Sequence, residues 1–189
     1  MKRRTVLLAT GATAVATLAP GLATAVSKDD ERAGVRRAAD DALAAVYRVQ
    51  PQARKAVESA AGYAAFSNFG MKLLIAGSGT GKGVAVNNKT KATTYMRMAE
   101  LQAGLGFGVK KFQLVWVFET EQALNKFVDS GWEIGAQATA AAKAGAMGAA
   151  FQGAVPVSTD VWLYQVTGDS LAMELTAKGT RYYKDSELN

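Results

Sequence analysis

The sequence predicts an α+β fold in which N-terminal helices pack on a strongly curved, mainly antiparallel, barrel-like sheet, with one further helix near residues 120–130. Two patterns lead to this prediction. Apolar residues recur at three- and four-residue steps up to about residue 61, which is typical of amphipathic helices. From residue 62 onward, short runs of aromatic and branched residues are separated by Gly, Asn, Lys and Thr, which is typical of strands and turns. No strand–helix–strand period is present, so we expect hairpins and not a parallel sheet.

The first 25 residues have the layout of a secretory signal peptide. Lys2, Arg3 and Arg4 form a positive n-region, an uncharged stretch runs to Leu18, and residues 23–25 supply an A-x-A cleavage site. A membrane anchor is the alternative, but this stretch is too short and too poor in Leu and Ile to span about 30 Å of hydrocarbon. We expect cleavage after residue 25 and export to the periplasm or outer cell envelope, by a Sec or a twin-arginine route.

The remaining residues, 26–189, are expected to form a single domain that is helical over 26–61 and rich in sheet over 62–189. Its first helix should span 27–49, because Ser27 is a suitable N-cap and acids follow it in the first turn, where the helix dipole favours negative charge. A second helix should span 51–61. Pro51 ends the first helix and can start the second, and Gly62 is a stop signal.

One helix is expected to interrupt the strands of the second part. Thr120 is a good N-cap, Leu124, Phe127 and Val128 form an apolar face, and Gly131 can end the helix. The strands are expected at 63–68, 71–76, 83–87, 93–101, 106–118, 134–142, 161–166, 170–176 and 180–184. Residues 136–150 stay open between helix and strand, because Ala favours a helix while the interspersed Gly and Thr oppose it.

The chain contains no Cys and no His, which excludes many catalytic chemistries. Thiolate nucleophiles, Ser-His-Asp triads and metal sites held by Cys or His are all ruled out. A catalyst would have to use carboxylates, Lys, Tyr, hydroxyls or a carboxylate-bound Mg or Ca. The central acids form no recognisable acid/base pair; they are Glu100, Glu119, Glu121, Asp129 and Glu133. We therefore expect no enzyme, with no catalytic residue, cofactor or metal site.

Two glycine-rich stretches resemble nucleotide motifs but do not satisfy them. In residues 76–83, Ala76 and Gly83 stand where a P-loop needs Gly and Ser or Thr, so a hairpin loop with Lys82 at its tip is expected. In residues 104–108, the last Gly of a dinucleotide fingerprint is missing, because Val109 stands there. The bare strand face of 104–108 indicates tight packing in a curved sheet, with a ligand groove as the alternative.

The basic residues are concentrated in one part of the chain. Removal of the n-region lowers the net charge from +6 to +3, whereas residues 72–111 contain seven basic residues and one acid. The seven are Lys72, Lys82, Lys89, Lys91, Arg97, Lys110 and Lys111. Lys82, Lys89 and Lys91 are expected in loops or turns. If hairpins bring the seven to one edge, each attracts an anionic head group by up to about 1 kcal/mol; the alternative is a solvated face. We predict that they bind lipid, and we expect no nucleic-acid partner.

Several aromatic residues are candidates for anchoring at a membrane interface. They are Trp116, Trp132, Trp162, Tyr182 and Tyr183. Trp116 lies in an apolar run and is expected in the core. Trp132 follows a helix stop and is the better exposed candidate.

Several motifs resemble those of the SYLF domain family. They are Gly62-Tyr63-Ala64-Ala65-Phe66-Ser67-Asn68, the Gly77–Gly83 loop, Thr94-Tyr95-Met96-Arg97-Met98, Gly104-Leu105-Gly106-Phe107-Gly108-Val109-Lys110, Phe127-Val128-Asp129-Ser130-Gly131-Trp132, Lys178-Gly179-Thr180-Arg181-Tyr182-Tyr183-Lys184-Asp185 and Leu188-Asn189. They occur in family order over nearly the whole of residues 26–189.

The resemblance implies a non-enzymatic lipid-binding domain. Eukaryotic members of this family bind phosphoinositides, and a yeast member binds and bundles actin. The basic amphipathic N-terminal helix associated with that lipid binding is replaced here by a charge-balanced helix, so bacterial anionic lipids such as phosphatidylglycerol or cardiolipin are the expected ligands. The first alternative is a protein-interaction module with a structural or stress-related role in the cell envelope. The second alternative is a hydrolase that uses carboxylates.

Overall fold

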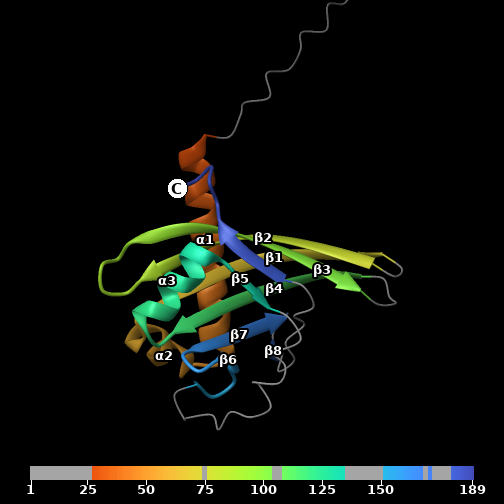
Figure 1. Ribbon diagram of the computed structural model, residues 1–189. Coiled ribbons are helices and arrows are strands. Elements are labelled where there is room, and N and C mark those ends of the chain that lie inside the picture. The colour runs from red at the N-terminus through yellow and green to blue at the C-terminus, as the bar shows by residue number, and fades with distance from the viewer. Residues whose placement is uncertain (1–26, 74–75, 104–107, 135–150, 168–169, 172–179) are drawn as a thin grey trace, which may run out of the picture.

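The computed structural model describes residues 27–73, 76–103, 108–134, 151–167, 170–171 and 180–189. Within these ranges it contains three helices and a nine-stranded sheet, which confirms the expected α+β class. Figure 1 shows α1 and α3 on opposite sides of the sheet.

The first helix, α1, spans Lys28–Val49 and begins where the sequence predicts. The Oγ of Ser27 accepts a hydrogen bond from the N–H of Asp30 at 3.1 Å, so one of the free donors at the helix start is satisfied. The buried side chains follow helical spacing: Val35, Ala39, Ala42, Ala45 and Val46. Small residues on this stripe let the helix lie close to the sheet.

The second helix, α2, spans Ala53–Ser59 and is shorter than predicted. The prediction that Pro51 starts it is wrong, because Pro51 and Gln52 lie in a turn in which the N–H of Ala53 donates to the carbonyl of Gln50 at 3.0 Å. Two consecutive helices that pack on the same sheet need such residues to change direction.

The strands form one antiparallel sheet with the order β5-β9-β3-β2-β1-β4-β7-β6, and β8 pairs with β7. The four long central strands are β1 (Gly62–Leu73), β2 (Ala76–Asn87), β3 (Thr93–Ala103) and β4 (Gly108–Phe118). The outer strands are β5 (Trp132–Ile134), β6 (Val155–Ser158), β7 (Val161–Thr167), β8 (Ser170–Leu171) and β9 (Thr180–Lys184). The third helix, α3, spans Glu121–Ser130, and the predicted Thr120 cap is present, with Oγ1 accepting from the N–H of Ala123 at 3.2 Å.

The sheet is strongly curled. Trp116 on β4 and Tyr182 on β9 belong to strands four positions apart, which would be about 19 Å in a flat sheet. Their ring centroids are only 5.0 Å apart, and Phe66 and Phe127 join the same cluster. The concave face therefore wraps around an aromatic core that α3 closes.

Alternate residues of each central strand serve two separate cores. Ala65, Val84 and Val115 pack with α1 in the first cluster, whereas Phe66, Ala85 and Trp116 pack with α3 in the second. Because side chains alternate across a strand, this pattern places the sheet between the two helical layers. The predicted core position of Trp116 is confirmed by its full burial.

The glycine-rich stretch 77–82 forms a strand, and its prediction as a hairpin loop is wrong. These residues lie inside β2 and pair with both β1 and β3, and the predicted strand at 71–76 is instead split between the end of β1 and the start of β2. Glycine is required at a neighbouring position: a Cβ on Gly83 would collide with the carbonyl oxygen of Ala65 and lie 2.5 Å from the ring of Phe66. Here glycine makes room for a neighbouring ring and does not mark a turn.

The strands differ from the prediction at two further places. The strand predicted at 134–142 already starts at Trp132, directly after Gly131, and the sequence predicts no strand where β6 lies. The backbone of Gly131 has φ +70°, and a Cβ there would lie 2.5 Å from the Tyr182 carbonyl oxygen, which explains why a glycine ends α3. The open choice between helix and strand for 136–150 falls outside the described residues, as do most of 104–108 and 172–179.

Candidate functional site

The seven predicted lipid-binding residues lie at three places along the central strands. Lys72, Lys110 and Lys111 lie toward one end of the sheet, where Lys72 is opposite Gly77 and Gly108. Lys82 and Arg97 are directly opposite each other near the middle of β2 and β3. Lys89 and Lys91 lie in the turn between β2 and β3, at the other end.

The distances between these three places decide whether they can act together. Lys72 and the start of the turn each lie five strand residues from the middle pair, which corresponds to about 17 Å. Lys111 and Lys110 lie two and three residues along the sheet and two strands across from Lys82, which corresponds to about 12 and 14 Å. The Debye length at physiological ionic strength is about 8 Å, so the three groups act on a charged ligand largely independently. For Lys72, Lys110 and Lys111, the structure describes the backbone positions alone.

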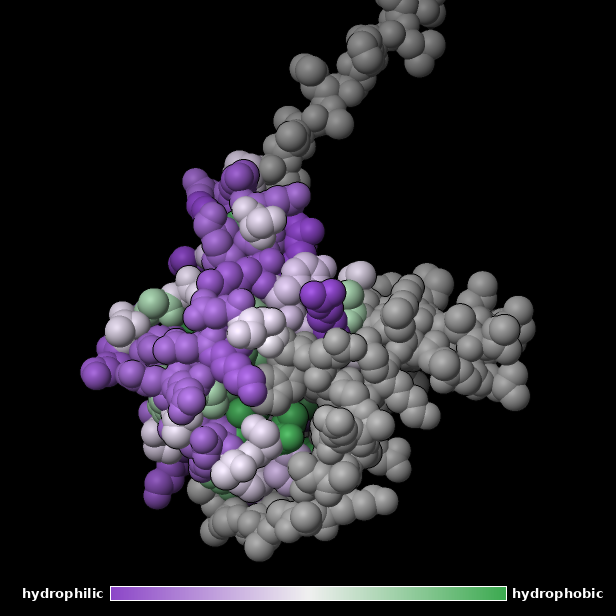
Figure 2. Space-filling model, in the orientation of Figure 1, coloured by the Kyte–Doolittle hydropathy of each residue, from purple (hydrophilic) through white to green (hydrophobic). Residues whose placement is uncertain are grey.

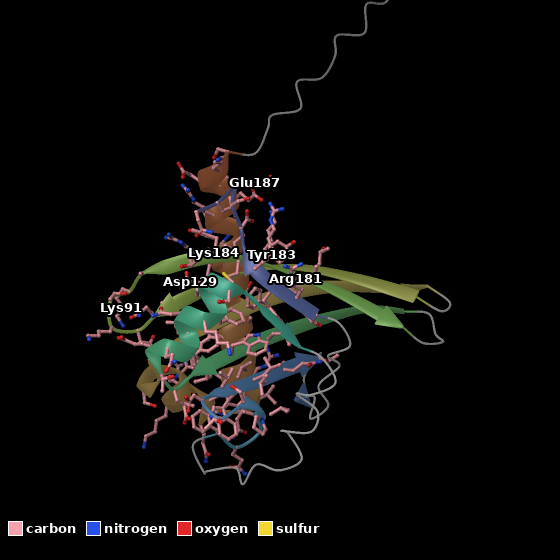
Figure 3. The ribbon with its side chains drawn as sticks, viewed as in Figure 1. Lys91, Asp129, Arg181, Tyr183, Lys184 and Glu187 are labelled. Atoms are coloured by element: carbon pink, nitrogen blue, oxygen red, sulfur yellow. The ribbon has the colours of Figure 1, made fainter. Side chains whose placement is uncertain are left out.

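The turn that carries Lys89 and Lys91 is held by a defined set of hydrogen bonds. The Oδ1 of Asn87 accepts from the N–H groups of Lys89 and Thr90, each at 2.9 Å, and the N–H of Lys91 donates to the Asn87 carbonyl at 2.8 Å. Lys91 has φ +59°, a left-handed conformation that this tight turn imposes. Both lysines are exposed, and Figure 3 shows Lys91 at the outer end of the hairpin.

The same turn is tied to the helical layer. The Nδ2 of Asn88 donates to the carbonyl oxygens of Val57 and Ala60, at 2.7 and 2.9 Å. Lys89 has one weak ion pair, with Glu121 of α3 at 3.9 Å, and its side chain is 81% exposed. Such an exposed pair contributes little stability, so the charge of Lys89 is available to a ligand.

A cavity of about 260 Å³ lies between this hairpin and α3. Its lining is amphipathic: Ala85, Asn87, Thr90, Ala92, Thr94, Leu124, Asn125 and Val128. In Figure 2 hydrophilic side chains dominate the visible surface over the N-terminal end of α1, α3 and the hairpin. The lysines of the turn therefore lie beside a cavity that has both apolar and hydrogen-bonding walls.

The two central cations are in a different environment, because each is paired with acids from distant parts of the chain. The predicted position of Lys82 in a loop or turn is wrong; it lies in β2 and forms an ion pair with Glu31 of α1. The Nε of Arg97 lies 2.7 Å from the Oδ2 of Asp185, and its Nη2 lies 2.6 Å from the Oε2 of Glu187. The side chain of Asp185 is 1% exposed, whereas that of Glu187 is 67% exposed.

The pKa of Asp185 reflects this pairing. Burial by itself would raise its pKa, but hydrogen bonds from Arg97 and from the backbone N–H of Glu187 outweigh that effect and lower it. The hydrogen bond to Asp185 likewise raises the pKa of Arg97. Asp185 is thus a buried carboxylate that stays charged because Arg97 is beside it.

Residues 185–189, which we call the clasp, are fastened to Tyr95 of β3. The amide of Asn189 spans the Tyr95 backbone: its Oδ1 accepts from the N–H and its Nδ2 donates to the carbonyl, both at 2.8 Å. Leu188 is buried in the α1-side core, and its carbonyl accepts from the Nε of Arg32 at 2.8 Å. The clasp therefore joins α1, β3 and β9.

The aromatic candidates for membrane contact separate clearly by burial. Trp116, Trp162 and Tyr182 are at most 9% exposed, so they are core residues and not anchors in this state. Tyr183 is 39% exposed. The side chain of Trp132, the candidate preferred from the sequence, lies outside the described residues.

The carboxylates considered for catalysis are not gathered into a buried pair in the described part of the chain. Glu119, Glu121 and Asp129 are exposed, and Asp129 pairs with Lys184 at 2.7 Å. The side chains of Glu100 and Glu133 are not described. Among the described residues, no group of three acids could hold a metal ion. None of the helices in those ranges has the length and hydrophobicity to cross a bilayer.

The acids that neutralise the central cations were not found from the sequence. From the sequence, Glu31 is only one of several acids in the first turn of a helix, and no partner is predicted for Asp185 or Glu187, which follow the last predicted strand. Their partners lie 51, 88 and 90 residues away in the chain, so no local spacing signals the pairing. The resemblance did include Asp185 and the pair Leu188-Asn189, which are the buried parts of the clasp.

Comparison with known proteins agrees with the motifs. Residues 99–189 match a family model described as "Ysc84: Las17-binding protein actin regulator". "Beta cell expansion factor A" of Aeromonas veronii is 30% identical over 161 residues, which cover 84% of this chain and 59% of that protein. The chain thus spans about three-fifths of the length of this relative. At the level of the family, these matches support a role in lipid binding or actin regulation. The motifs and both matches agree: the chain belongs to the Ysc84, or SYLF-domain, family.

Proposed function

We propose that this chain is a non-enzymatic protein that docks on the anionic phospholipid head groups of a membrane, with the β2–β3 hairpin as its main contact. The observation that carries this proposal is the rigid turn that holds exposed Lys89 and Lys91 beside an amphipathic cavity. Since the turn is already ordered, binding costs little backbone entropy.

The energetics favour an anionic membrane over a neutral one. Each lysine near a negatively charged surface contributes up to about 1 kcal/mol, and this contribution is screened by salt. The apolar Leu124 and Val128 and the polar Asn87 and Thr94 form opposite kinds of cavity wall. Such a lining suits the boundary between a head group and its acyl chains. The predicted cations of the far strand ends, Lys72, Lys110 and Lys111, would add a separate electrostatic contact.

Vesicle flotation tests this proposal. The wild-type chain should float with vesicles of phosphatidylcholine and phosphatidylglycerol, and not with phosphatidylcholine alone. Changing Lys89→Ser and Lys91→Ser together should weaken the apparent affinity about tenfold, a loss consistent with two surface charges.

The matched control is the double variant Lys28→Ser and Lys55→Ser, which removes the same charge from exposed positions on α1 and α2. It should retain most of the binding. Equal flotation with neutral and anionic vesicles, or an equal loss in both double variants, would contradict the proposal.

We also propose that the protein is exported to the periplasm or outer cell envelope, because of the leader-like first 25 residues. The phosphatidylglycerol and cardiolipin of a bacterial envelope would then be its ligands. Mass spectrometry of the N-terminus of the protein isolated from cell fractions tests this: a periplasmic form that begins at Val26 is expected. An uncleaved form confined to the cytoplasm would argue against it.

A protein partner is the second candidate, and the family description, which names an actin regulator that binds Las17, favours it. Co-sedimentation with purified actin filaments would separate the two candidates. Binding to filaments without any binding to anionic vesicles would favour the protein partner.

A further inference from the structure

We propose that Lys82 and Arg97 form a second head-group site on the sheet, and that Glu31 and Glu187 of the same chain close it. This inference rests on the proposed lipid binding and adds a regulated site to it. The two cations are directly opposite each other on β2 and β3, which places their Cα atoms about 5 Å apart. Two neighbouring positive side chains on one sheet face favour an anion between them.

The acids that occupy this place differ in how firmly they are held. Asp185 is buried and orients the guanidinium through its Nε, so it acts as part of the structure. Glu187 contacts only the Nη2 edge, and its side chain is 67% exposed. If Glu187 turns into solvent, the Nη2 donors of Arg97 become available while Asp185 keeps the guanidinium in place.

The ion pair between Lys82 and Glu31 is also weakly held. This ion pair is partly exposed, with side chains 41% and 33% accessible. Partly exposed pairs exchange with solvent and with competing anions at small free-energy cost. Release of Glu31 and Glu187 would therefore leave Lys82 and the Nη2 donors of Arg97 for a lipid phosphate, with Asp185, which interacts with both cations, as the acid that stays in place.

The surroundings of this pair indicate a membrane and not a free anion. On β9, Tyr183 is directly opposite Arg97 and is 39% exposed, and Arg181 lies two residues away on the same face of the strand. Figure 3 shows Arg181 and Tyr183 together on β9, with Glu187 near the start of α1. Tyrosine and arginine side by side are typical of membrane interfaces, where a ring and a cation meet head groups.

The test compares vesicle binding by the full chain with and without the two closing acids. The double variant Glu31→Gln and Glu187→Gln should bind phosphatidylcholine–phosphatidylglycerol vesicles about fivefold or more tightly than wild type, since each freed cation contributes up to about 1 kcal/mol. Adding Tyr183→Ser and Lys82→Gln to this variant should remove the gain.

The control variant Asp41→Asn and Glu119→Gln makes the same change in net charge at exposed positions outside the proposed site. An equal gain in this control would show a general charge effect and overturn the inference, and so would an unchanged affinity of the double variant. If the double variant does not show a cooperative thermal transition, Glu187→Gln alone, at an exposed carboxylate, is expected to give about half of the logarithmic gain.

The two proposals can fail separately. If Lys89→Ser with Lys91→Ser weakens vesicle binding while Glu31→Gln with Glu187→Gln does not strengthen it, the hairpin contact is supported and the closed site is refuted. If the wild type does not distinguish anionic from neutral vesicles, the proposed function falls first.

Discussion

The β2–β3 turn and the clasp use charged residues in opposite ways. Lys89 and Lys91 in the turn are exposed and the ion pair of Lys89 is weak, whereas Arg97, from the same basic stretch, is held by Asp185 and Glu187. The difference follows from what lies opposite each residue. The turn projects beyond the sheet, while Arg97 meets the segment that follows β9.

The comparison shows that an excess of positive charge in the sequence is not one functional signal. Part of it stabilises the fold through buried pairing, and part is left for a ligand. A buried carboxylate that faces an arginine supports structure, whereas an exposed pair contributes little. Four predictions test this distinction.

The largest effect is expected from Leu188→Ala in the clasp. Leu188 is 1% exposed within the α1-side core, so its truncation should lower the free energy of unfolding by about 2–4 kcal/mol. Urea denaturation followed by circular dichroism measures this. The neighbouring exposed residue provides the control, since Ser186→Ala should change the value by less than about 0.5 kcal/mol. Similar values for both would mean that the clasp is not part of the core.

The next effect is the loss of the Arg97–Asp185 pair. Asp185→Asn keeps the shape but removes the buried charge, and we expect a destabilisation of about 2 kcal/mol. Glu187→Gln, on the same arginine but exposed, should cost less than about 0.5 kcal/mol. Equal losses would show that Asp185 and Glu187 contribute equally to stability, and that Glu187 is not the more weakly held of the two acids.

The pH dependence of that loss has a definite sign. The folded-state pKa of Asp185 is lowered below its unfolded value of about 3.9, so its contribution is fully present above that pH and is lost as the pH falls through the folded pKa. The difference in unfolding free energy between wild type and Asp185→Asn should therefore be constant from pH 5 to 7 and shrink below about pH 4. A difference that persists unchanged down to pH 2 would indicate that the charge of Asp185 contributes nothing.

The smallest effect concerns the turn itself. Lys91 has φ +59°, so Lys91→Gly should raise the free energy of unfolding by up to about 1 kcal/mol, because glycine adopts this conformation without a steric penalty. Lys89→Gly, at a position without a positive φ, should not raise it. Vesicle binding should weaken in both variants despite their different stabilities, which would separate the function of the turn from its stability.

Features that depend on neighbours within a few residues could be predicted from the sequence alone. The caps at Ser27 and Thr120, the stripe of α1, the apolar face of α3 and the strand at 180–184 all follow from local spacing and were predicted correctly. The continuity of β2 through its glycines depends on contacts between strands, since the need for a position without a side chain at Gly83 comes from Phe66 on another strand. The same holds for which cations are neutralised by nearby acids. Glu31, Asp185 and Glu187 meet their partners only because the sheet brings together residues 51 to 90 positions apart, and pairing over such separations leaves no periodic trace in the sequence.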